Sequence, residues 1–141
     1  MDTPELRQTV ARQLRRSQAH AGLTAALEGV PETIAGQAVA GHAHTAWQQL
    51  EHMRLAAEDL IAYCTDPEYK ALEWPDGYWP DGPKPPSAEA WSASGRRLLD
   101  ATERMARIVE DPEVPFALLD LGAEQAREAL AREAEHGFAL D

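Results

Sequence analysis

The most regular pattern of apolar positions lies in the middle of the chain. Six apolar residues recur there at spacings of three and four: Trp47, Leu50, Met53, Ala57, Leu60 and Cys64. This period predicts a helix whose apolar side, with Trp47 and Met53 on it, is buried against other helices. Thr45, or His44 just before it, is expected to begin the helix, and Asp66 followed by Pro67 to end it.

Three more helices are predicted, over residues 4–17, 88–110 and 123–138. The first follows a hydroxyl cap and a proline, and the second follows Ser87. The third is rich in alanine, glutamate and arginine, and its apolar face is thin. Residues 18–28 are expected to form a short helix or turns, and residues 33–43 a connecting loop.

Residues 68–86 contain several prolines and two Asp-Gly pairs, which exclude regular structure and favour turns. Three aromatic residues, Trp74, Tyr78 and Trp79, lie close together in this segment. An ordered loop that packs its rings on the helices is favoured over a ligand cage at the mouth of a pocket. Its length is typical of a functional loop or a long crossover.

No segment has the pattern of a strand. Four helices with long links predict an all-α fold, a four-helix bundle with crossover loops, formed by residues 1–141 as a single domain. A chain of 141 residues suits one such core.

The chain is acidic, with 13 lysines and arginines against 24 aspartates and glutamates and a formal charge of −11. This charge disfavours binding to nucleic acid or to an anionic membrane surface. The one candidate basic patch is formed by Arg12, Arg15 and Arg16. A lone cysteine, Cys64, together with the absence of a signal-peptide pattern or a long apolar run, favours a cytoplasmic protein.

Two segments carry a resemblance to a known family. Residues 43–54 read AHTAWQQLEHMR and residues 74–80 read WPDGYWP. In these segments the chain resembles the DinB/YfiT-like superfamily; weaker matches lie at Gln18–His20, Gly122 and Arg127–Leu130. The resemblance covers nearly the whole chain and implies a DinB/YfiT-like four-helix bundle, often dimeric.

Many members of this superfamily hold a divalent metal ion with three histidines. The resemblance places one ligand at His52 and the other two in the last helix, where this chain has Glu135 and Ala139. His136 lies one residue out of register with the first of these. His52, Glu135 and His136 are therefore the candidate ligands, and zinc, nickel or iron is the metal expected with histidine and carboxylate donors.

Other polar residues have simpler interpretations beside this one. His52 on its own is also consistent with a histidine that makes one hydrogen bond, and Asp59 lies two turns further along the same strip of the helix as a possible supporting ligand. His42 and His44 are expected to be cap and loop residues, His20 to make a structural hydrogen bond, and Cys64 to be an inert buried thiol.

Two functions remain open at this stage. Members of the superfamily with known activity are metal-dependent hydrolases or thiol-dependent transferases, so the resemblance implies such an enzyme acting on an unidentified small molecule, with a weakened metal site. The alternative is a non-catalytic dimeric binding protein that keeps the bundle. A homodimer is expected in both cases, because the thin last helix leaves apolar surface for a partner subunit to bury.

Overall fold

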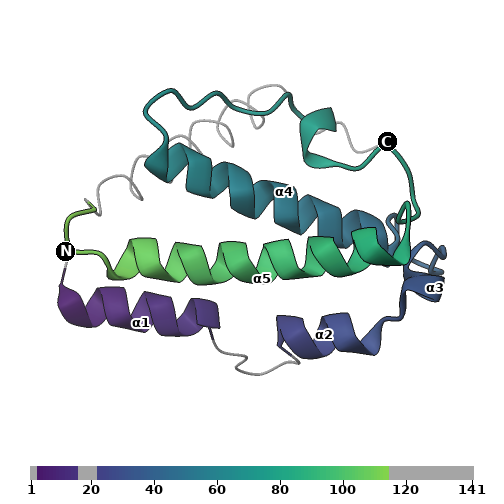
Figure 1. The fold of residues 1–141 in the computed structure, drawn as a ribbon, viewed down its shortest axis with the longest axis horizontal. Coiled ribbons are helices and arrows are strands. Elements are labelled where there is room, and N and C mark those ends of the chain that lie inside the picture. Colours follow the sequence, from purple (N-terminus) through teal and green to yellow (C-terminus); the bar gives the residue numbers. More distant parts are fainter. Residues whose placement is uncertain (1–2, 16–21, 115–141) are drawn as a thin grey trace.

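The structure is a computed structural model that describes residues 3–15 and 22–114. These residues form five α-helices and one 3₁₀ turn (Figure 1): α1 Pro4–Arg15, α2 Leu23–Gly29, α3 Glu32–Ala35, α4 Ala46–Thr65, η1 Asp76–Tyr78 and α5 Ala88–Glu110. Within these ranges the structure contains no strand. The predicted all-α class is confirmed.

The ends of the long helices lie where the caps predict them. The Thr45 hydroxyl accepts a hydrogen bond from the Gln48 backbone N–H, and the Gln48 side-chain oxygen accepts one from the Thr45 backbone N–H, which forms a capping box at the start of α4. The Ser87 hydroxyl accepts from the Ala90 backbone at the start of α5. Two short elements were missed: α3 begins one residue before the predicted loop 33–43 and extends into it, and η1 lies inside the proline-rich segment. Each is only about one turn long, too short to show a period.

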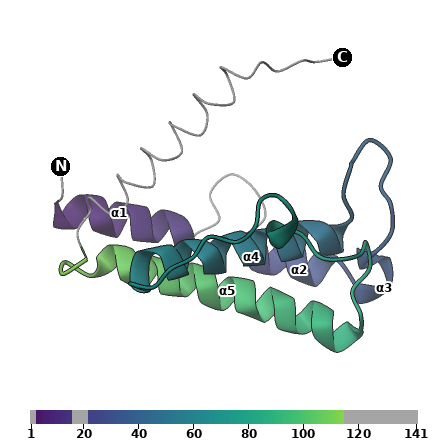
Figure 2. The same cartoon turned by 90° about the horizontal axis from the view of Figure 1, so that it is seen from above.

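Helix α5 lies between α4 on one side and α1 and α2 on the other (Figure 1), and the view from above also shows it beside α1 (Figure 2). Helices α1 and α2 follow one another along one side of α5 and run antiparallel to it, so that Arg15 meets Glu103 and Leu27 meets Gly95. Helix α4 packs on another side and runs parallel to α5. A parallel pair needs a connection that returns along the whole of α4, about 30 Å for 20 residues. Residues 66–87 are therefore a crossover, one of the two predicted alternatives for this loop.

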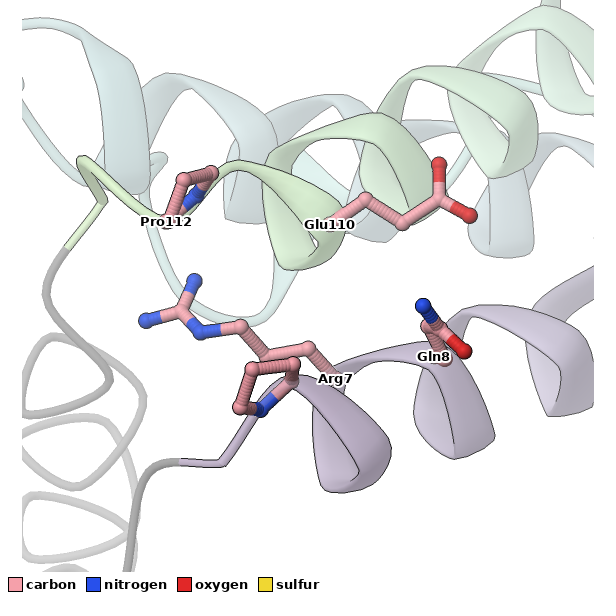
Figure 3. A pocket seen from close by; sticks show the side chains of 5 residues that line it. Arg7, Gln8, Glu110 and Pro112 are labelled. Atoms are coloured by element: carbon pink, nitrogen blue, oxygen red, sulfur yellow. The ribbon is translucent and has the colours of Figure 1, made fainter.

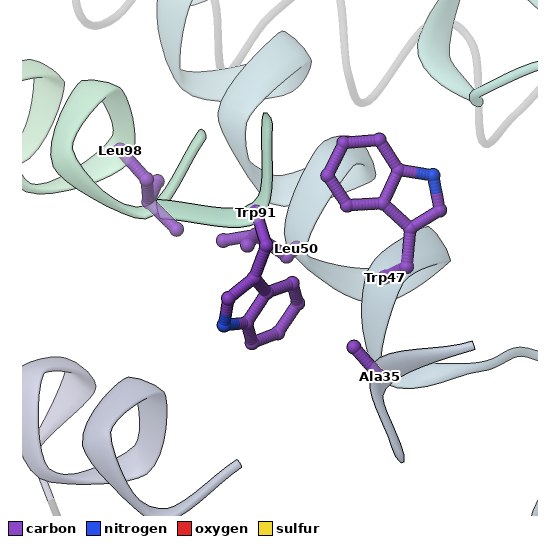
Figure 4. Packing of buried hydrophobic residues seen from close by; sticks show 5 residues of the cluster. All are labelled: Ala35, Trp47, Leu50, Trp91 and Leu98. Carbon is purple, nitrogen blue, oxygen red and sulfur yellow. The ribbon is translucent and has the colours of Figure 1, made fainter. Parts of the chain in front are cut away.

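The largest apolar cluster joins α3, α4 and α5 near the starts of the two long helices (Figure 4). Its buried members are Ala35, Trp47, Leu50, Trp91 and Leu98. The two indoles are tilted by 49° with ring centroids 6.5 Å apart, a favourable arrangement for an aromatic pair. Burial of the two indoles thus holds the start of α4 against the start of α5.

The predicted apolar face of α4 is wrong in part. Trp47 and Leu50 are buried, but Met53 and Leu60 are each 46% exposed. Helix α4 instead turns Glu51 and Arg54 toward α5, and both are buried. These two side chains neutralise each other, which allows charged positions to replace apolar ones at the contact.

Polar contacts join α1 to the last turns of α5. Arg7, only 5% exposed, donates from its guanidinium to the backbone carbonyls of Val109, Asp111 and Val114. These carbonyls lie at the helix end, where intrahelical donors are missing. At the other end of α1, Arg15 pairs with Glu103 and Glu110. The predicted basic patch therefore loses Arg15 to ion pairs, and Arg16 lies outside the described residues.

The predicted last helix, residues 123–138, also lies outside the described part of the chain. Its apolar face, its length and the candidate ligands Glu135 and His136 on it stay predictions. Among the described helices, none combines the length and the hydropathy needed to cross a membrane.

Candidate functional site around His52

The crossover loop lies along α4 and contacts it through η1 (Figure 1). Tyr78 attaches the loop at two points. Its backbone carbonyl meets the imidazole of His52, and its hydroxyl reaches the carboxylate of Asp59, seven residues further along α4. The loop is therefore anchored to the same strip of α4 that carries the candidate metal ligand.

The His52 ring makes one hydrogen bond in the described part of the chain, from Nδ1 to the Tyr78 carbonyl oxygen at 2.8 Å. A carbonyl oxygen only accepts, so Nδ1 carries the proton in this contact. The neutral ring then has its free lone pair on Nε2. Metal-binding histidines in proteins are commonly held in this way, with one nitrogen donating to a carbonyl and the other left for the ion.

Two histidines enclose the indole of Trp79. His52 stacks on one side with ring centroids 4.1 Å apart and planes inclined by 6°. His44 stacks with centroids also 4.1 Å apart and planes inclined by 29°. The hydrogen bond to Tyr78 and the stack on Trp79 together fix the plane of the His52 ring.

Asp59 accepts hydrogen bonds from two phenols. Tyr78 donates to Oδ2 at 2.7 Å, and Tyr69 lies 3.0 and 3.1 Å from the two oxygens. Burial, followed by the hydrogen bond and the charge of Asp59, raises the pKa of Tyr78 and that of Tyr69 above their ordinary value. Both phenols therefore stay protonated and act as donors. Asp59 was predicted as a possible supporting ligand, but its carboxylate is engaged by these hydroxyl groups.

A second polar cluster lies between α4 and α5. Arg54 donates to both oxygens of Glu51 at 2.8 and 2.7 Å, and the Ser94 hydroxyl donates to the same carboxylate. Burial acts to raise the pKa of Glu51, but the hydrogen bonds from Arg54 and Ser94 outweigh it, and the pKa lies below the ordinary carboxyl value. Arg54 also reaches Glu58, which binds Arg97 of α5. Every charge in this cluster has a partner, as expected of a structural ion-pair network.

The described residues supply one candidate ligand. Among them, no three histidine, cysteine, aspartate or glutamate side chains come together as a metal-binding group. The donor chemistry of His52 fits a metal ion, with Nε2 as the ligand atom. The other two candidates, Glu135 and His136, lie outside the described residues, so the structure does not place them relative to His52.

The remaining candidates have other surroundings. His44 is a loop residue as predicted, although its contact with Trp79 was not anticipated. Cys64 is half-buried, and burial raises the pKa of its thiol, so the thiol is protonated and poorly nucleophilic at neutral pH. His20 lies outside the described part of the chain.

A cavity of about 490 Å³ lies between the start of α1 and the end of α5 (Figure 3). Its lining consists of Pro4, Arg7, Gln8, Glu110 and Pro112. Arg7 is committed to the backbone carbonyls of residues 109, 111 and 114. His52 is not among the residues that line this cavity, so the cavity is separate from the candidate site around His52.

The sequence indicated the aromatic loop and His52 separately but not their contact. Trp79 is 27 residues beyond His52, and no local pattern shows which of three neighbouring aromatic residues meets the helix. The available signal was the length of the loop, which allows a crossover, because a crossover between parallel helices must return along α4. Comparison of the chain with models of protein families, with curated proteins and with solved structures finds no match in any of the three.

Proposed function

We propose that this chain is a DinB-like four-helix-bundle protein that binds a divalent metal ion through Nε2 of His52. The family assignment depends on the two segments at residues 43–54 and 74–80. In the described part of the chain these segments lie against each other, with the loop of the second on the helix of the first. The fourth helix of the proposed bundle is residues 123–138.

The hydrogen bond from His52 Nδ1 to the Tyr78 carbonyl is the observation that carries this proposal. It favours the neutral tautomer that has its proton on Nδ1 and its lone pair on Nε2. Stacking on Trp79 restricts rotation of the ring, so the lone pair of Nε2 keeps one direction toward an approaching metal ion.

Glu135 and His136 are the proposed partners of His52 in the site. A divalent ion held there would lower the pKa of a bound water or thiol and so supply a nucleophile at neutral pH. This chemistry suits a hydrolase or a thiol-dependent transferase acting on a small molecule. The charge of −11 makes a nucleic-acid substrate unfavourable, and we infer a cytoplasmic location from the lone cysteine.

Metal analysis of the purified full-length chain tests the proposal. We expect about one ion of zinc, nickel or iron per chain, lost in His52→Ala and retained in His42→Ala, which changes an exposed loop histidine. Glu135→Ala and His136→Ala should each weaken binding. A metal-free protein that shows no thermal shift on addition of zinc, nickel or ferrous iron would contradict a metal site.

A second candidate function, a non-catalytic homodimeric binding protein, is favoured by the exposed side of α4. Met53 and Leu60 lie two turns apart on that side and are each 46% exposed. A second copy of the chain would bury them. Sedimentation should then find a dimer that dissociates in Met53→Lys with Leu60→Lys. A monomeric wild-type protein would contradict this candidate.

A further inference from the structure

We propose that Asp59 is a positioning residue that sets the tautomer and orientation of His52 through Tyr78. Its consequence for metal affinity rests on the function proposed above, whereas its consequence for the tautomer concerns the metal-free protein. Asp59 touches neither the His52 ring nor Nε2 by any contact of the described chain. It acts through the loop.

The first step is the grip of Asp59 on the loop. The carboxylate accepts from the Tyr78 hydroxyl at 2.7 Å and from the Tyr69 hydroxyl at 3.0 Å. Hydrogen bonds to a charged acceptor are roughly twice as strong as those between neutral groups. Two tyrosines from different parts of the crossover thus converge on one anionic point of α4.

The second step links the position of the Tyr78 hydroxyl to that of the Tyr78 carbonyl. Both groups belong to one residue, whose main chain is constrained at the end of the 3₁₀ turn η1. With its hydroxyl held at Asp59, the residue has its carbonyl directed at His52 Nδ1, 2.8 Å away. The next residue, Trp79, then lies against the face of the imidazole. Asp59 therefore fixes two groups. One is the Tyr78 carbonyl, which selects the tautomer of His52, and the other is the Trp79 indole, which fixes the plane of the imidazole.

Tyr69 makes the arrangement more than a single hydrogen bond. Its ring packs edge-on against Tyr63 of α4 at a centroid distance of 5.4 Å. Its hydroxyl lies 3.0 Å from Oδ1 and 3.1 Å from Oδ2 of Asp59, so it reaches both oxygens of the carboxylate that Tyr78 binds through Oδ2. Asp59 is thereby held in one orientation, as a residue that positions another must be.

Nitrogen-15 NMR of the histidine rings tests the proposal in the metal-free, full-length protein, at a pH where the imidazoles are neutral. Wild type should show His52 with the proton on Nδ1. Tyr78→Phe deletes only the hydroxyl. This variant and Asp59→Ala should each change the tautomer ratio of His52 several-fold toward the Nε2-protonated form, which neutral imidazoles favour in water. Asp59→Asn keeps one acceptor oxygen and should restore most of the wild-type population.

Asp100→Ala is the matched control, since it removes an exposed carboxylate from α5, which carries no part of this loop. It should leave the tautomer unchanged. If zinc or nickel binds to the wild type, its affinity should fall about 10–100-fold in Asp59→Ala and in Tyr78→Phe, as expected when an outer hydrogen bond of a ligating histidine is lost.

The outcomes are separable. An unchanged His52 tautomer in Tyr78→Phe, and in Asp59→Ala if that variant folds, overturns the proposal, whatever the metal does. A tautomer that shifts in a protein that binds no metal supports the positioning role of Asp59 and contradicts the proposed function instead. Tyr78→Phe decides the matter if Asp59→Ala fails to fold.

Discussion

The imidazole of His52 and the indole of Trp79 lie almost parallel, with ring centroids 4.1 Å apart and an angle of 6° between their planes. The two residues come from different kinds of structure, a capped helix and an irregular loop. Their contact makes the loop part of the surroundings of the candidate ligand. Because the opposite side of the indole meets His44, Trp79 also joins the segment before α4 to the crossover.

Replacement of Trp79 by alanine should destabilise the protein and release the loop. The substitution removes two stacked contacts, each worth about 0.5–1.5 kcal/mol beyond the area buried. We expect the free energy of unfolding to fall by about 2 kcal/mol, measured by urea denaturation. Trp74→Ala is the comparison, because Trp74 is 72% exposed and makes one tilted ring contact, with Tyr78, so a smaller loss of about 0.5–1 kcal/mol is expected there. Equal losses in the two variants would contradict the role given to Trp79.

Glu51→Leu should cost much more than its size suggests, because it leaves the Arg54 guanidinium buried without its main partner. Breaking a buried ion pair from one side typically costs about 3–5 kcal/mol, and we expect the lower end because Glu58 still pairs with Arg54. The double variant Glu51→Leu with Arg54→Leu should recover part of the loss in chemical denaturation. The explanation would be contradicted if the double variant lost more free energy of unfolding than the two single variants lose together.

The same carboxylate predicts how stability depends on pH. The pKa of Glu51 is depressed in the folded protein below its ordinary value of 4.5. Its contribution is therefore complete above the unfolded pKa and is lost as the pH falls through the lower folded pKa. We expect the free energy of unfolding to decline below about pH 4.5, and to decline less steeply in Glu51→Gln. If the free energy of unfolding falls equally steeply with pH in both proteins, other carboxylates are responsible for the decline.

Local signals in the sequence predicted the two long helices α4 and α5 well. The cap at Thr45, the cap at Ser87 and the prolines beyond each helix act within a few residues, so α4 and α5 lie within about a residue of their predicted ends. The rotation of α4 was not predictable from its own pattern. Glu51 and Arg54 count as polar in any periodicity, and their burial depends on each other and on Ser94, 43 residues away. The partner of His52 was missed for the same reason, since Trp79 reaches it only through the crossover.

Gly36→Ala should loosen the contact between the segment after α3 and the end of the crossover. A Cβ at residue 36 would clash with Cγ of Lys84 and lie 2.9 Å from the backbone Cα of the same residue. The backbone must move, and overpacking of this kind costs about 1–3 kcal/mol. Thermal unfolding of Gly36→Ala should therefore begin at a lower temperature than that of wild type. Gly29→Ala is the matched control: no heavy atom lies within 4 Å of its new Cβ, and it should be neutral or stabilising by about 0.5 kcal/mol. A Gly36→Ala protein as stable as wild type would show that the crossover is not held at this point.

Arg7→Met should destabilise the end of α5 although it keeps much of the apolar stem. The variant loses the donors that reach the carbonyls of residues 109, 111 and 114, which leaves the helix terminus without the charged group that satisfies it. A loss of about 2–3 kcal/mol is expected, together with faster hydrogen exchange of the amides in the last turn of α5. Arg12→Met is the comparison on the same helix, since Arg12 is exposed and donates to Thr9, and it should change the stability by no more than about 0.5 kcal/mol. Exchange rates in α5 that are the same in both variants would mean that packing of α1, and not the guanidinium, holds this helix end.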